Sequence, residues 1–200
     1  AGMDLSAFGV AHAGVDPCAL RQAIEPGRRL VEAWAQVPQI TVAAVEGGAY
    51  GVSWSLAMAC DMIFAAEDAR FGAPFLDFGL VPDGGSSWLL TRAVGRVRAM
   101  ELMLLGDRLP GPKALEWGLV NFVVPDDEVE AKGMELAARL AQGPRSLGLI
   151  KRVAWAAADA SFEQALSNER NGQREACRSE DFIEGPKAFS EKRKPDWKGR

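Results

Sequence analysis

A glycine-rich turn between two apolar segments constrains this 200-residue chain more than any other feature. The turn is Gly47-Gly48-Ala49-Tyr50-Gly51, and it follows the β-branched run Ile40–Val45. Its glycines accept backbone angles that other residues avoid, so we expect an irregular turn here instead of a regular element. The apolar stretch Ser53–Cys60 then predicts a short helix. Its first N–H groups lack partners within the helix and can bind an anion or a developing oxyanion.

A lone carboxylate stands on a second turn further along the chain. The segment Val81-Pro82-Asp83-Gly84-Gly85-Ser86-Ser87 places this acid between a proline and two glycines, which specify a tight turn. An oxyanion site with one carboxylate nearby is the minimum equipment for moving a proton beside a carbonyl group. The other interpretation of Asp83 is a turn residue that bonds its own backbone.

The order of the expected elements favours an α/β fold. Ile40–Val45 and Met62–Ala66 predict parallel strands with a right-handed connection through the short helix. The glycine-rich turn then lies at the carboxyl end of a strand, where α/β folds bind ligands. Beyond it we expect a helix pair broken at Gly95, a short helix closed by Gly118 and a strand over residues 119–124.

A long helix is expected before the first strand. Asp16 suits the N-cap and Pro17 the first helical position, whereas Pro26-Gly27 predicts a kink or a break. The apolar residues expected to face a core are Leu20, Ile24, Leu30, Val31 and Trp34.

From Asp126 onward the pattern is helical. Helices are expected over residues 127–142, 144–158, 161–178 and 181–191, with Asp126 as one N-cap and a capping box from Ser161 to Gln164. We therefore divide the chain into an α/β core, residues 1–125, and a helical region, residues 126–200. The second region is expected to serve oligomerisation and to cover the pocket.

Composition argues against several classes of protein. The net charge of -4 is unlike that of nucleic-acid-binding proteins, and no apolar run is long enough to span a membrane. The chain has three cysteines without a CxxC pair and a single histidine, which favours neither a disulfide framework nor a metal site. Free thiols suit a reducing compartment, so we expect a cytoplasmic protein.

Several spaced motifs resemble the crotonase superfamily, the enoyl-CoA hydratase/isomerase fold. They lie at Ala1–Leu5, Val45–Asp61, Phe71–Gly79, Leu80–Gly95, Ala99–Asp107, Ala114–Val120 and Phe189–Pro195. The resemblance implies a spiral of ββα units with further strands preceding Ala1, and a homotrimer or a dimer of trimers. It also implies an acyl-CoA thioester as substrate, with no cofactor and no metal.

The resemblance assigns roles to individual residues. The backbone N–H groups of Met3 and Val52 correspond to the oxyanion hole of the family, and Asp83 corresponds to an active-site acid. Lys192 and Arg193 belong to a basic cluster that can approach the CoA phosphates, although a solvated helix end explains them almost as well. Further pocket residues that the resemblance implies are Asp4, Leu5, Gly51, Ser55, Phe75 and Gly84.

The hydratases of this family carry glutamates at two positions where this chain has Ser55 and Phe75. Neither residue exchanges protons usefully at neutral pH. Hydration must activate water and protonate a carbon, whereas double-bond isomerisation needs one carboxylate that removes and returns a proton. We therefore expect Asp83 to serve an enoyl-CoA isomerase, similar to Δ3,Δ2-enoyl-CoA isomerases and to the ring-opening isomerases of phenylacetate degradation. Asp77 is a rival base, better explained as a solvated loop residue.

Two other functions stay open from the sequence. One is an enoyl-CoA hydratase, a lyase of fatty-acid or aromatic-acid degradation, in which the acid and a bound water share the work. The other is a non-catalytic acyl-CoA-binding protein that kept the pocket and lost the acids. Turnover of an enoyl-CoA separates the first from the second.

Overall fold

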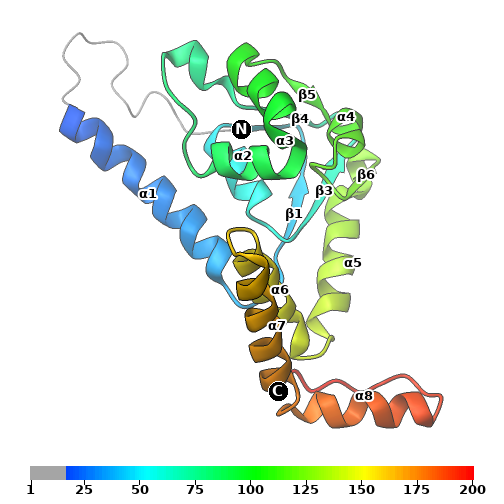
Figure 1. Ribbon diagram of the computed structural model, residues 1–200. Helices are drawn as coiled ribbons and strands as arrows, with labels where there is room; N and C mark the ends of the chain where they lie inside the picture. The colour runs from blue at the N-terminus through cyan, green and yellow to red at the C-terminus, as the bar shows by residue number, and fades with distance from the viewer. Residues whose placement is uncertain (1–16) are drawn as a thin grey trace. The chain divides into compact units, whose positions relative to one another are not determined.

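The computed structural model describes the backbone of residues 17–200 and the side chains from residue 24 onward (Figure 1). The chain divides into two compact units. The first spans Ala1–Ala35 and Val42–Gly133, and the second spans Gln36–Thr41 and Met134–Arg200. The assignment of catalysis to residues 1–125 and of oligomerisation to residues 126–200 stays a prediction.

The first unit contains two small sheets. One has the order β1-β3-β6 with all strands parallel, and the other has the order β2-β4-β5, in which β5 is antiparallel to β4. The predicted parallel pairing of the first two long strands is confirmed, with Val42 opposite Met62. The strand bounds are β1 Val42–Val45, β2 Gly48–Tyr50, β3 Met62–Ala66, β4 Arg70–Gly72, β5 Leu109–Pro110 and β6 Phe122–Val124.

The expectation of an irregular glycine-rich turn was wrong, because three of its five residues form strand β2. Only Gly47 and Gly51 have positive φ angles, of 61° and 57°. Strand β4 supplies the missing partners: Arg70 N–H donates to Gly47 O at 2.7 Å, and Gly51 N–H donates to Gly72 O at 3.0 Å. Pairing with a neighbouring strand thus outweighs the weak β propensity of glycine.

Helices and 3-10 turns complete the described part of this unit. Helix α3 changes direction at Gly95, which has φ 74° and ψ 165°, so the predicted break is confirmed. Gly118, with φ 78°, follows the short helix as predicted. The bounds are α1 Pro17–Gln36, α2 Val52–Met58, η2 Pro74–Phe78, α3 Ser86–Leu105 and α4 Gly111–Glu116.

Helix α1 starts at Pro17 as predicted. It runs through Pro26 without ending, so the chain is not broken there, whereas the predicted kink stays a prediction. Ion pairs from Arg28 to Glu25, at 2.8 Å, and to Glu32, at 2.7 Å, join successive turns around the proline and support the helix there. Leu30 and Trp34 are 53% and 38% exposed, so their predicted burial was wrong, whereas Val31 is buried.

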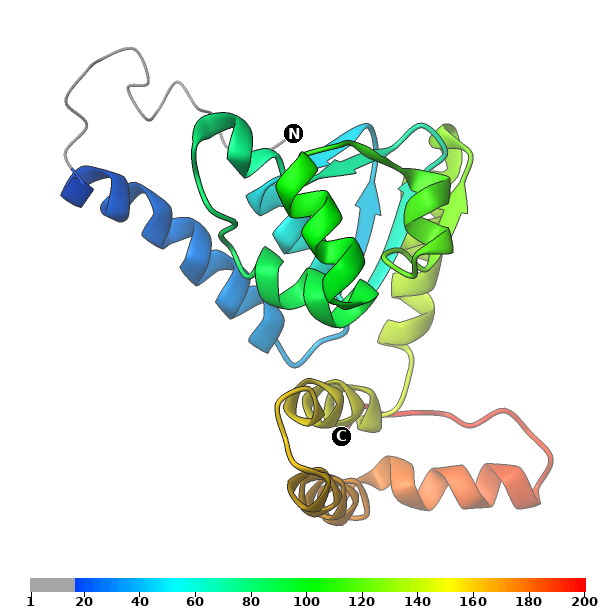
Figure 2. The same cartoon turned by 45° about the horizontal axis from the view of Figure 1, so that its top comes forward.

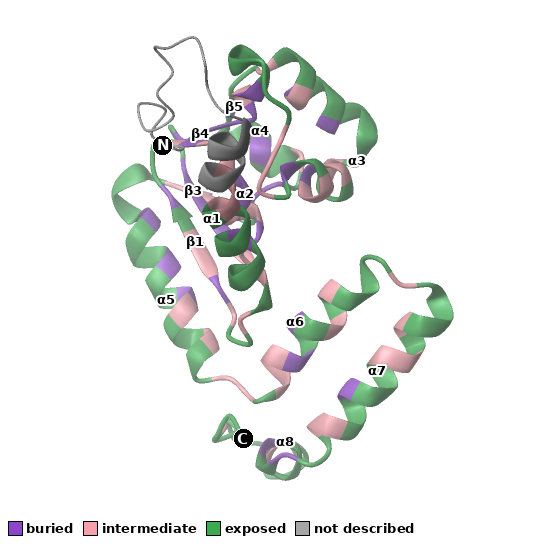
Figure 3. Ribbon diagram, turned by 90° about the vertical axis from the view of Figure 1, so that its left-hand side faces the viewer, coloured by how far each residue is buried: buried purple, intermediate pink, exposed green. Residues whose placement is uncertain are grey.

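The core of the first unit lies between the sheets and helices α2 and α3. Trp54, Phe71 and Leu90 are almost completely buried, and the rings of Trp54 and Phe71 lie 5.8 Å apart. Strand β3 is buried as well, and is coloured purple along most of its length in Figure 3. Helix α2, which carries part of the candidate site, is therefore anchored by a large aromatic side chain.

The second unit is helical. Helices α6 and α7 lie side by side (Figure 2), and Gly172 allows their approach, because a Cβ atom there would lie 3.0 Å from Val153 Cγ2. Ser161 and Gln164 form the predicted capping box of α7. The bounds are α5 Val129–Ala141, which begins in the first unit, then α6 Ser146–Ala157, α7 Phe162–Ala176 and α8 Glu180–Ser190.

Asp126 does not cap a helix, contrary to expectation. It begins a 3-10 turn, Asp126–Glu128, that precedes α5, and the residue at the cap of that turn is Pro125. The carboxylate Oδ1 of Asp126 accepts a hydrogen bond from Asp68 N–H at 3.3 Å instead. The residue thus fastens the turn to the loop between β3 and β4.

Candidate active site

Three segments that lie far apart in the sequence meet at the start of helix α2. A Cβ atom added to Gly51 would lie 3.6 Å from the ring of Phe75, which belongs to η2. A Cβ atom added to Gly84 would lie 3.2 Å from Val52 Cγ2 and 3.0 Å from Ser55 Cβ. The structure therefore brings together all the predicted pocket residues that lie within its described part.

Gly51 sets the direction in which the chain enters α2. Its φ of 57° and ψ of -126° are angles that residues with a side chain rarely adopt. Its N–H is bonded to Gly72 O, and its carbonyl accepts from Ser55 N–H at 3.0 Å. Val52 follows as the first helical residue, and an N–H group in this position has no acceptor within its own helix. Met3, Asp4 and Leu5 lie outside the described residues.

The main chain of Asp83 is held through its carbonyl oxygen. Ser86 donates to it from its N–H at 3.0 Å and from its Oγ at 2.6 Å. Ser55 Oγ lies 3.2 Å from the same oxygen and 3.3 Å from Gly51 O, so its hydrogen is shared between the two. Gly84 and Gly85 both have positive φ angles, of 57° and 84°, which return the chain sharply into α3. The loop that carries the acid is thus fixed against both α2 and α3.

The side chain of Asp83 is less well satisfied than its main chain. Residue Asp83 is partly buried, and within the described part of the chain its Oδ1 atom is buried without a hydrogen-bond partner. Burial raises the pKa of this carboxyl above its usual value, because removal from water disfavours the charged form. An unpaired carboxylate with a raised pKa is a stronger base than an exposed one, and such groups gather at functional sites.

The groups beside the first turn of α2 are apolar or neutral. Phe75 is 9% exposed and lies against Gly51, and Ser55 is completely buried. No second carboxylate comes from either position. Asp77, the rival base, lies on η2 and is exposed, as expected of a solvated residue. Trp54, whose indole N–H is also buried without a partner among the described residues, packs in the core.

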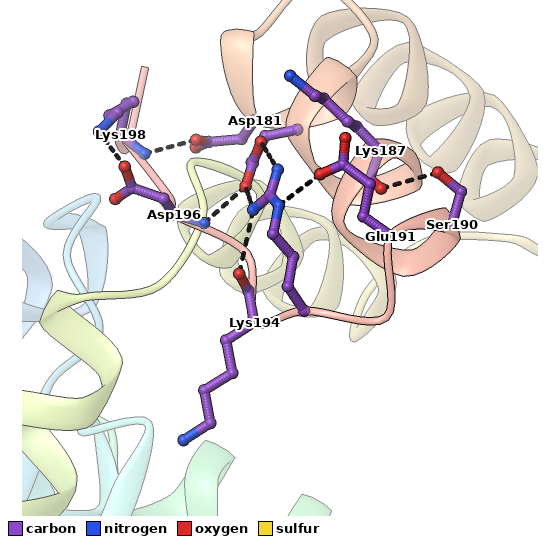
Figure 4. A network of polar contacts seen from close by, with 9 residues as sticks. Asp181, Lys187, Ser190, Glu191, Lys194, Asp196 and Lys198 are labelled. Atoms are coloured by element: carbon purple, nitrogen blue, oxygen red, sulfur yellow. Dashed lines mark hydrogen bonds and ion pairs between the residues drawn. The ribbon is translucent and has the colours of Figure 1, made fainter.

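The basic cluster near the end of the chain has a structural use. Arg193 donates to Glu184 at 2.5 and 3.0 Å and to Glu191 at 2.6 Å, so its charge is already matched by carboxylates (Figure 4). Lys192 is exposed, with a φ of 54° just after α8. Their contact with CoA phosphates stays a prediction.

Ser86 is the residue of this site to which sequence reasoning assigned no role. Its signal is the spacing: an Asp followed by two glycines and a serine lets the serine at i+3 close a turn onto the Asp carbonyl. Over residues 17–200, no group of three or more metal-binding side chains comes together. None of the helices described is long and apolar enough to cross a membrane.

Comparisons with known proteins agree with this geometry. The sequence model of the enoyl-CoA hydratase/isomerase family matches residues 1–200. The 1,2-epoxyphenylacetyl-CoA isomerase of Escherichia coli K12 is 41% identical over 172 residues, which cover 86% of this chain and 66% of that protein. This chain thus spans slightly less than two thirds of that relative's length.

Solved structures of hydratases are similar as well. The enoyl-CoA hydratase of Polaromonas sp. JS666 has a TM-score of 0.91 at 33% identity, covering 99% of this chain and 77% of that one. The enoyl-CoA hydratase of Bacillus anthracis has a TM-score of 0.89 at 33% identity, covering 94% and 73%. The fold is therefore the crotonase fold with a C-terminal helical region, and the chain belongs to the enoyl-CoA hydratase/isomerase family of the crotonase superfamily.

Proposed function

We propose that this chain is the acyl-CoA-processing part of an enoyl-CoA isomerase in which Asp83 is the single proton shuttle. The observation that carries the proposal is the buried, unpartnered Oδ1 of Asp83 on a loop packed against Val52 and Ser55. Membership of a family whose matching relative in Escherichia coli is named a 1,2-epoxyphenylacetyl-CoA isomerase supports it.

The reaction needs one base and one oxyanion site. The Asp83 carboxylate removes a proton from the carbon next to the thioester of a 3-enoyl-CoA, and the electron pair moves onto the thioester oxygen to form a dienolate. The N–H groups of Val52 and Met3 stabilise that oxygen. The protonated Asp83 then returns the proton two carbons away, so the double bond shifts from C3–C4 to C2–C3. Atoms and charge balance without a cofactor or a metal.

The surroundings of Asp83 suit this work. A general base in position contributes roughly 10² to 10⁴ in rate, and its efficiency improves as its pKa rises towards the working pH. Losing one oxyanion donor typically costs about 3 to 4 kcal/mol of transition-state stabilisation. The Phe75 ring beside Gly51 places an apolar group next to the first turn of α2, which strengthens electrostatic effects there.

Hydration is the second candidate. The similar solved structures are titled enoyl-CoA hydratases, which favours a water-adding reaction. Ser55 and Phe75 argue against hydration, because neither supplies a second acid. Asp83 alone would then have to activate water and afterwards supply a proton. A non-catalytic acyl-CoA carrier is the third candidate, and it predicts tight acyl-CoA binding without turnover.

We also infer that the whole protein is a homotrimer or a dimer of trimers that works in the cytoplasm, in fatty-acid or aromatic-acid degradation. Three large apolar side chains of the second unit support assembly: Phe162, Ile183 and Phe189 are 74%, 72% and 87% exposed. Light scattering of the purified protein tests the assembly.

The function is tested with Asp83→Asn on a 3-enoyl-CoA, with Asp77→Asn as the matched control. Both changes remove one negative charge from neighbouring segments, but Asp77 is exposed. The proposal expects Asp83→Asn to lose at least about 10²-fold in kcat and Asp77→Asn to keep wild-type kcat. Equal turnover by wild type and Asp83→Asn contradicts the proposal. Faster consumption of a 2-enoyl-CoA in water than of the 3-enoyl isomer favours the hydratase.

A further inference from the structure

Two buried serine hydroxyls converge on one carbonyl oxygen, that of Asp83. Ser86 Oγ lies 2.6 Å from it and Ser55 Oγ 3.2 Å. Ser55 and Ser86 are 0% and 1% exposed, and they come from the start of different helices, α2 and α3. Water does not reach these hydroxyls, so neither bond is exchanged for one to solvent. Ser55 Oγ also lies 3.3 Å from Gly51 O, so its single hydrogen is shared between two carbonyl groups.

The loop also lies close to α2 at Gly84. A Cβ atom on Gly84 would lie 3.0 Å from Ser55 Cβ and 3.1 Å from Ser55 Oγ, both shorter than ordinary contacts. Glycine at position 84 therefore lets the acid-bearing loop pack against Ser55.

We propose that Ser55 and Ser86 are positioning residues for the Asp83 carboxylate. The inference rests on the proposed role of Asp83. The two hydroxyls hold the Asp83 main chain so that its carboxylate stays beside the first turn of α2 and partly out of water.

The positioning role is tested by removing each hydroxyl. A hydrogen bond of this kind corresponds to roughly 2- to 10-fold in rate, so Ser86→Ala and Ser55→Ala should each lower kcat by about that factor and leave KM unchanged. Ser86→Thr keeps the hydroxyl and should restore kcat. Ser87→Ala is the matched control, because the exposed neighbour Ser87 offers its carbonyl to Thr91 Oγ1 and has no contact with the Asp83 carbonyl among the described residues.

A titration separates positioning from general loss of structure. Burial alone raises the pKa of Asp83, since no charged neighbour in the described part of the chain contributes. Loosening the loop should admit water and lower this pKa, which ¹³C NMR of the carboxyl reports without any substrate. The Asp83→Asn spectrum identifies the signal. A lower pKa in Ser86→Ala, and an unchanged one in Ser87→Ala, is the expected result.

Equal kcat and equal carboxyl pKa in Ser86→Ala and Ser87→Ala overturn the positioning role, even where Asp83→Asn is inactive. Full activity of Asp83→Asn is a different result, and it contradicts the proposed function itself.

Discussion

Replacing Gly84 by alanine tests whether close packing fixes the acid-bearing loop. Gly84 has a φ of 57°, and an alanine there meets Ser55 Cβ at 3.0 Å and Val52 Cγ2 at 3.2 Å. The left-handed conformation costs about 1 to 2 kcal/mol for a residue with a Cβ atom. Overpacking adds about 1 to 3 kcal/mol, because the buried Ser55 has little room to move. The expected loss in the free energy of unfolding is therefore about 2 to 5 kcal/mol.

Gly47→Ala is the matched control. Gly47 has nearly the same φ, 61°, but a Cβ atom there meets nothing within 4 Å. Its cost should be the conformational part alone, about 1 to 2 kcal/mol. Urea unfolding of both variants at one pH gives the difference, which isolates the contact with Ser55 and Val52.

The same pair of variants has different expected effects on catalysis. A displacement of about 1 Å can cost 10²-fold in rate when it moves a reacting group, so Gly84→Ala should lose roughly that factor in kcat. Gly47→Ala should lose little, because Gly47 has no side-chain contact with the loop. Equal stability losses together with equal kcat values would refute the reasoning that packing on α2 positions Asp83.

Three further predictions follow from individual contacts. Because the pKa of Asp83 is raised above 3.8, the folded state binds more protons than the unfolded state just above that pH. The free energy of unfolding therefore falls as the pH rises through that range. Asp83→Asn removes this cost and should raise Tm at pH 7. Burial works to raise the pKa of Asp181, but hydrogen bonds from the backbone N–H groups of Lys198, Arg145 and Gly199 lower it overall. The carboxylate therefore contributes to the free energy of unfolding at neutral pH, and this contribution is lost as the pH falls below the usual aspartate range. Asp181→Ala should cost about 3 to 5 kcal/mol in urea unfolding at pH 7, since it leaves those N–H groups without their acceptor. Ser161→Ala removes the cap of α7 and should cost about 1 kcal/mol by the same assay.

Local sequence patterns predicted most elements of the fold. The parallel strands β1 and β3, the break at Gly95 and the capping box at Ser161 follow from residue types that act over a few positions. Strand β2 could not be predicted in this way, because its formation depends on pairing with Arg70–Gly72 of β4, about twenty residues further along the chain. The exposed Trp34 was missed for a similar reason: helical periodicity shows which residues share a face, and it does not show what covers that face.

Some residues of the candidate site could be predicted from the sequence, whereas their contacts could not. The resemblance to the crotonase superfamily pointed to Asp83, Val52 and Gly51, and the structure brings their segments together. The hydrogen bond from Ser86 Oγ to the Asp83 carbonyl could be identified only in the folded chain, because a serine near a turn has many possible acceptors. The burial of Asp83 Oδ1 also depends on segments that only the folded chain brings close.

The central claim, that one buried carboxylate carries a proton between two carbons, is tested most directly by following a deuterium label. The substrate is a 3-enoyl-CoA with deuterium at C2, and the position of the label in the 2-enoyl product is read by mass spectrometry and NMR early in the reaction. Because Asp83 is partly shielded from water, the account predicts that wild type delivers a measurable share of the deuterium to C4 and that Asp83→Asn forms no such product. Product that carries only solvent hydrogen at C4, formed equally fast by Asp83→Asn, would contradict it.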